Sequence, residues 1–130
     1  GRVTGLPRPL EEIEKQAMVA WVLSFRPRFA EAVDRVLQSA PGTLDDYVFH
    51  RLGESGVAES HGRDAGRLLR GLLATLKTLS YDSGEVSQLA RQALMHGADP
   101  NDLIAAADDM VRLGCAGAEQ LWDLARNRRQ

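Results

Sequence analysis

The chain has 130 residues, of which 44% are hydrophobic and 26% are charged, values typical of a single globular domain. Its 16 basic and 18 acidic residues leave a formal net charge of −2 at pH 7, so the chain lacks the broad positive field that holds nucleic acid. The single cysteine, Cys115, excludes an internal disulfide and is compatible with a reducing compartment.

The chain is predicted to begin with an arm that leads into one helical domain. Residues 1–9 contain two prolines and no apolar periodicity, which predicts a flexible N-terminal arm, and residues 10–130 are predicted to form the domain. From Leu10 the apolar residues repeat with helical spacing, and Pro27 suits the first turn of a second helix. The longest apolar run, Met18 to Leu23, is far too short to cross a bilayer, so no membrane partner is expected.

A short helix and a loop are predicted next. Thr43 and Asp46 have a spacing that resembles a capping box, which predicts the start of a short helix that ends at Gly53. The following residues, 54–62, are rich in glycine, serine and charged side chains. This composition predicts a mobile loop before the middle of the chain.

The strongest helical signal lies in the middle of the chain. Apolar residues, mostly leucines, recur at alternating spacings of four and three from Ala65 to Leu79, which predicts a central leucine-rich helix over about residues 63–80. The opposite side of this helix is predicted to carry Arg63, Arg67, Arg70 and Lys77. Gly66 and Gly71 lower the intrinsic stability of such a helix, so packing against other elements must hold it together.

Three further helices are predicted in the rest of the chain. The first is predicted to start at the capping signal of Asp82 and Glu85 and to stop at Gly97. The second is predicted to start at Asp99 and Pro100 and to stop at Gly114. The third is predicted to begin near Ala118 and to end at the basic end of the chain. No segment alternates between apolar and polar residues with period two. The predicted fold class is therefore all-α, a compact bundle of six to seven short-to-medium helices around the central helix.

The turn at residues 96–101 has two partial resemblances. Its sequence, HGADPN, resembles the tip of an ankyrin repeat, but the match does not continue into the following helix and there is no second copy. The spacing of Ala93, Gly97 and Leu103 is similar to that of a helix-turn-helix. However, the second helix contains three aspartates and one arginine, which would oppose DNA phosphates. The segment is therefore interpreted as two capped helices that meet at a glycine.

The chemistry-bearing residues show no catalytic or metal-binding pattern. His50, His61 and His96 lack the spacing of metal ligands, and one cysteine cannot form a zinc site, so no metal and no cofactor are expected. Ser60, His61 and Asp64 are close in sequence, but a catalytic triad needs side chains from separate elements. We therefore expect local hydrogen bonds here and no enzymatic activity.

These observations predict a non-catalytic protein–protein interaction domain. Arginine far outnumbers lysine and alanine is frequent, a bias of GC-rich bacterial genomes, which favours a bacterial adaptor, regulator or effector segment. The predicted location is the bacterial cytoplasm or a destination reached from it, and the start at Gly1 without methionine is compatible with an excised domain. The expected partner is another protein with an acidic surface, and a homodimer stays open. The predicted partner-binding residues are Arg63, Arg67, Arg70, Lys77, Trp21 and Phe25.

The alternative function is nucleic-acid binding. It would use the same basic helix face together with the basic C-terminal tail, Arg126 to Gln130. The net negative charge of the chain makes this alternative weaker than protein binding.

Overall fold

The computed structural model of the chain describes residues 28–38, 43–44, 46–79 and 84–129. This part contains seven helices and two short strands, which confirms the all-α fold class. The elements are α2 (Phe29–Leu37), β1 (Thr43–Leu44), α3 (Asp46–Ser55), α4 (Val57–Ser60), α5 (Gly62–Thr75), β2 (Thr78–Leu79), α6 (Glu85–Met95), α7 (Pro100–Leu113) and α8 (Ala118–Arg129). The predicted N-terminal arm, and the predicted helix with Trp21 and Phe25, lie outside the described residues.

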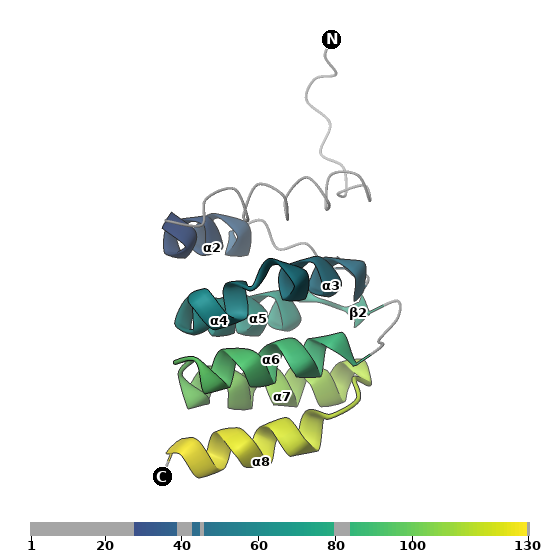
Figure 1. The fold of residues 1–130 in the computed structure, drawn as a ribbon. Helices are drawn as coiled ribbons and strands as arrows, with labels where there is room; N and C mark the ends of the chain where they lie inside the picture. Colours follow the sequence, from purple (N-terminus) through teal and green to yellow (C-terminus); the bar gives the residue numbers. More distant parts are fainter. Residues whose placement is uncertain (1–27, 39–42, 45, 80–83, 130) are drawn as a thin grey trace.

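The helices are stacked in layers between α2 at one end and α8 at the other (Figure 1). In between, α3 and α4 share a layer with α5, and α6 shares the next layer with α7. α5 packs against α2, α6 and α7, so it holds the central position that the leucine pattern predicts. α8 packs mainly against α7. None of the helices in the described residues combines the length and apolar character that a bilayer crossing requires.

The leucines of α5 form the middle of one continuous core. Leu68, Leu69, Leu72 and Leu73 are all at most 2% exposed, and they share a single buried cluster with side chains from every other described helix. Each fully buried leucine stabilises the fold by roughly 1.5–3 kcal/mol relative to an exposed one. The predicted leucine-rich core is therefore confirmed.

α5 ends earlier than the sequence predicts. Its last residue is Thr75, and Leu76 is already extended with a ψ of 134°. Thr78 and Leu79 form β2, which pairs in parallel with Thr43 and Leu44 of β1. The predicted helix end near residue 80 is therefore wrong, because this pairing takes the backbone of residues 78–79 out of the helix. Thr43, predicted to cap the next helix, belongs to the paired strand instead.

The predicted loop at residues 54–62 is largely helical. α3 continues to Ser55, and α4 follows directly after Gly56, whose positive φ of 78° turns the chain between the two helices. Val57 and Ala58 of α4 are each 1% exposed. The prediction of a loop fails because it weighs the polar residues of this stretch and overlooks the two apolar side chains that anchor it in the core.

Some of the predicted helix caps in the last third of the chain are present in the structure. Asp99 caps α7 as predicted, because its side chain accepts a hydrogen bond of 2.9 Å from the backbone N–H of Asn101. Gly114 ends α7 in the left-handed conformation. Gly84 occupies the N-cap position of α6 and provides no side chain, and Asp82, the predicted cap, lies outside the described residues.

The two internal glycines of α5 are points of close helix packing. A Cβ on Gly66 would lie 2.8 Å from the Cβ of Ala98, and a Cβ on Gly71 would collide with the side chain of Leu37 in α2. Glycine therefore lets the turn before α7 and the helix α2 approach α5 closely. This explains why a central helix tolerates residues that weaken it in isolation.

Candidate functional site

The basic face of α5 is joined to the helices on both sides of it. Arg67 donates a hydrogen bond of 2.7 Å to Asp64 in its own helix and forms an ion pair with Asp34 of α2. Arg70 donates one of 2.8 Å to Asp102 of α7. The hydrogen bond to Asp64, together with the charge of Asp34, raises the pKa of Arg67 above its ordinary value. Two of the four predicted cations on α5 are thus neutralised within the chain.

The other two cations lie at the ends of this face. Arg63, in the first turn of α5, and Lys77, beyond its end, are exposed, and their side chains make no hydrogen bond or ion pair in the part of the chain that the structure describes. The predicted partner-binding residues on α5 therefore do not form one uniform positive patch. Trp21 and Phe25, the aromatic members of that predicted set, lie outside the described residues.

The residues of the SHGRD stretch make local contacts. The Ser60 hydroxyl donates to the carbonyl oxygen of Gly56 at 3.1 Å, and Asp64 accepts from Arg67. The ring of His61 lies against that of Phe29 in α2, with 5.4 Å between the ring centroids. The expectation of local hydrogen bonds is therefore confirmed for Ser60 and Asp64, whereas His61 makes a ring contact with a distant helix.

A groove of about 260 Å³ between α3 and α6 contains His50. The two carboxylate oxygens of Glu85 lie 2.8 and 2.9 Å from its Nδ1, and Glu54 lies 3.5 Å from its Nε2. An ionised carboxylate only accepts hydrogen bonds, so Nδ1 donates to Glu85 and links α3 to α6. Within residues 28–38, 43–44, 46–79 and 84–129, no cluster of histidine, cysteine and acidic side chains suits a metal ion.

Sequence reasoning did not identify a second groove, of about 400 Å³, between α7 and α8. Its lining divides into four apolar residues and three acidic residues: Ala107, Val111, Ala118 and Trp122, and Asp108, Glu119 and Asp123. Val111 is 64% exposed, and Trp122 is half-buried. None of the three carboxylates has a hydrogen bond or ion pair among the described residues. The groove is therefore apolar, with an acidic rim that none of the described residues neutralises.

The signal for this groove in the sequence is weak. Glu119 and Asp123 are four residues apart, so they share one face of α8. Asp108 and Val111 are three apart and share one face of α7. Only the packing of α7 against α8 brings the two faces together, and no local pattern reports that packing.

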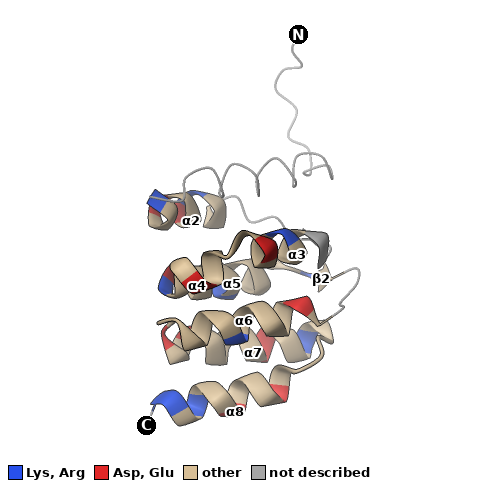
Figure 2. Ribbon diagram, viewed as in Figure 1, with Lys and Arg blue, Asp and Glu red and all other residues tan. Residues whose placement is uncertain are grey.

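A cation of the chain lies at the edge of this groove. The guanidinium carbon of Arg126 is 5.1 Å from the ring centroid of Trp122, a cation–π contact within α8. Arg126 belongs to the last turn of α8 with Arg128 and Arg129. Figure 2 shows this basic end of the helix in blue, while both signs of charge are spread over the layers above it.

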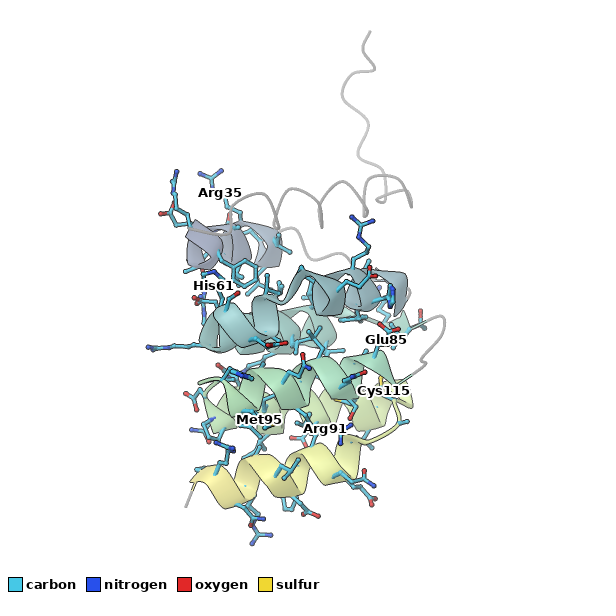
Figure 3. The ribbon with its side chains drawn as sticks, in the orientation of Figure 1. Arg35, His61, Glu85, Arg91, Met95 and Cys115 are labelled. Atoms are coloured by element: carbon cyan, nitrogen blue, oxygen red, sulfur yellow. The ribbon has the colours of Figure 1, made fainter. Side chains whose placement is uncertain are left out.

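The large apolar side chains that the described surface exposes all lie on the last three helices. Met95 on α6 is 66% exposed, Val111 on α7 is 64% exposed, and Leu124 on α8 is 43% exposed. Met95 shares a face of α6 with Arg91 (Figure 3). This end of the molecule is therefore more apolar at its surface than the face of α5.

The chain was also compared with known proteins. No family model, no curated protein and no solved structure matches it. The functional interpretation therefore depends on the surfaces and contacts described above.

Proposed function

We propose that this chain is a helical domain that binds another protein and acts without catalysis, as an adaptor, regulator or effector segment of a bacterium. The observation that carries the proposal is the groove between α7 and α8, where the exposed Val111 and the half-buried Trp122 both line the same hollow. Single exposed apolar residues are common on protein surfaces. An apolar groove beside a half-buried tryptophan is, by contrast, typical of a protein-binding surface.

The way the layers are joined supports this proposal. Ion pairs connect α2 to α5 through Asp34 and Arg67, and α5 to α7 through Arg70 and Asp102. These contacts add to one continuous apolar core. A surface held on such packed helices loses little conformational entropy when a partner binds, which favours affinity.

The proposal is tested by affinity purification followed by mass spectrometry and by titration of the recovered partner. Val111→Asp places a charge in the exposed apolar surface, and Ala30→Asp on the exposed side of α2 is the control. We expect a partner whose affinity falls by about tenfold or more in Val111→Asp and is unchanged in Ala30→Asp. Failure to find a partner sensitive to Val111, Arg63 or Lys77 would contradict the proposal.

Nucleic-acid binding is the second candidate, because three arginines lie in the last turn of α8. A salt titration with generic DNA and RNA distinguishes it from protein binding. Binding through phosphate contacts must weaken steeply as salt increases. Absence of binding at low salt would exclude this candidate, and a steep salt dependence that Arg128→Gln and Arg129→Gln reduce would support it.

A further inference from the structure

We propose that the groove between α7 and α8 binds a basic amphipathic helix of the partner protein. This inference rests on the proposed function and specifies the surface and the chemistry of the partner. It differs from the expectation drawn from the sequence, which placed the contact on the arginines of α5 and expected an acidic partner.

The groove has the apolar lining that such a helix requires. Two packed helices form its walls, and four apolar residues line its interior. Val111 exposes 64% of its surface there, so an apolar side chain of the partner would remove it from water. An amphipathic helix offers apolar anchors on one face to such grooves.

The negative charges at the rim indicate that the partner segment carries positive charge. α7 contains three aspartates, and two of them are used within the chain: Asp102 binds Arg70, and Asp109 accepts a hydrogen bond of 3.1 Å from Arg112. The third, Asp108, lines the groove and has no ion pair in the described part of the chain. Glu119 and Asp123 of α8 also line the groove and also have no ion pair in the described part of the chain. On α7 and α8, the carboxylates without an ion pair in the described residues therefore all line the groove.

The tryptophan in the groove already binds a cation of the chain. The guanidinium of Arg126 lies 5.1 Å from the Trp122 ring centroid, which shows that this ring can accept a planar cation. In addition, Glu119 and Asp123 are separated by one helical turn. Lysines or arginines four residues apart on a partner helix have the same separation. A basic helix thus matches both the sign and the spacing of the rim.

The test uses a synthetic peptide and the intrinsic fluorescence of Trp122. The chain has two tryptophans, so Trp21→Phe leaves Trp122 as the sole tryptophan reporter. The probe is a capped amphipathic peptide of about 18 leucine and lysine residues, long enough to form a helix. A peptide with glutamate in place of lysine is the control. We expect the lysine peptide to shift the emission of Trp122 and to bind more weakly as salt increases.

Variants locate the binding surface. Glu119→Gln with Asp123→Asn should weaken the lysine peptide by about five- to tenfold, and Val111→Asp by about tenfold or more. Glu59→Gln is the matched control, because Glu59 is also exposed, lies in a first turn and forms no ion pair in the described residues. Equal binding of the two peptides would overturn the inference, as would an unchanged affinity in the double variant.

Two further outcomes separate this inference from the proposed function. If a captured partner depends on Val111 but the lysine peptide does not bind, the proposed function stands and the basic helix is the wrong occupant. If the unmodified chain self-associates in sedimentation experiments and Val111→Asp is a monomer, the groove is an interface between copies, which also overturns the inference.

Discussion

Arg112 of α7 donates a hydrogen bond of 2.8 Å to the carbonyl oxygen of Leu73 in α5. The same guanidinium donates another of 2.9 Å to the carbonyl oxygen of Leu76. The last carbonyl groups of a helix have no partner within it, and the negative end of the helix dipole attracts a cation. α5 has no glycine at its end, so a side chain from a distant helix fulfils the role of a C-terminal cap.

Replacement of Arg112 by alanine should therefore destabilise the fold. The loss of two charge-assisted hydrogen bonds, discounted for the partial exposure of the guanidinium, should lower the free energy of unfolding by about 1–2 kcal/mol. Arg91→Ala is the control, because Arg91 is exposed on α6 and its side chain makes no hydrogen bond or ion pair in the described residues. Urea denaturation measures both variants. Equal stabilities would show that the contact contributes nothing.

This contact also explains why the sequence predicts the start of α7 but not the end of α5. The cap of α7 is local, because Asp99 accepts from a backbone N–H two residues away. The apolar spacing of α5 continues through Leu76 and Leu79, and residues 75–79 contain no glycine or proline that would signal the end of the helix. The helix ends because Arg112, 36 residues after Leu76, binds its carbonyl, and because β2 pairs with β1. Such distant contacts leave no local signal.

The candidate surfaces follow the same rule. The four cations of the predicted central helix could be placed on one helix face from their spacing alone. The neutralisation of Arg67 and Arg70, however, depends on Asp34 and Asp102, which are 33 and 32 residues away from them. The groove between α7 and α8 is likewise formed by packing of two helices. A helical period predicts which side chains share a face, but not which face of another helix opposes it.

Two glycines should respond in opposite directions to the same substitution. A Cβ on Gly53 in α3 would meet no atom within 4 Å, so Gly53→Ala should raise the free energy of unfolding by up to about 1 kcal/mol. A Cβ on Gly62 would lie 2.6 Å from the carbonyl carbon of His96, which is backbone and cannot move cheaply. Gly62→Ala should lower the free energy of unfolding by about 1–3 kcal/mol. Thermal and urea denaturation distinguish the two, and stabilisation by both would refute the close packing of α5 on the end of α6.

Charge reversal on α5 should separate residues that stabilise the fold from residues available to a partner. Arg70→Glu places a negative charge against Asp102, whose side chain is only 14% exposed, and should lower the free energy of unfolding by about 1–2 kcal/mol. Arg63→Glu and Lys77→Glu break no ion pair in the described residues and should change it by less than about 0.5 kcal/mol. Melting temperatures check this difference. If Arg70→Glu is as stable as the unmodified chain, the ion pair does not stabilise the fold. Arg70 is then as suitable a probe of partner binding as Arg63.

The ion pair between Arg28 and Glu31 predicts a small dependence of stability on acid. The hydrogen bond from Arg28, 2.5 Å long, and the charge of its guanidinium lower the pKa of Glu31 below its ordinary value. Because the pKa is lower in the folded than in the unfolded chain, the pair stabilises the fold above the ordinary pKa of glutamate. This contribution is lost as pH falls through the folded-state pKa. Both side chains are exposed, so we expect the change in stability to be small and the change in pKa to be the better readout.

NMR titration of the Glu31 carboxyl group measures this shift directly. Arg28→Gln should raise the pKa of Glu31 towards its ordinary value, because it removes both the hydrogen bond and the nearest positive charge. Arg35→Gln is the matched control, since Arg35 acts on Glu31 only through a weaker charge interaction and its loss should raise the pKa less. An equal effect of the two substitutions would mean that long-range charge controls Glu31. In that case the hydrogen bond at the start of α2 would not hold in solution.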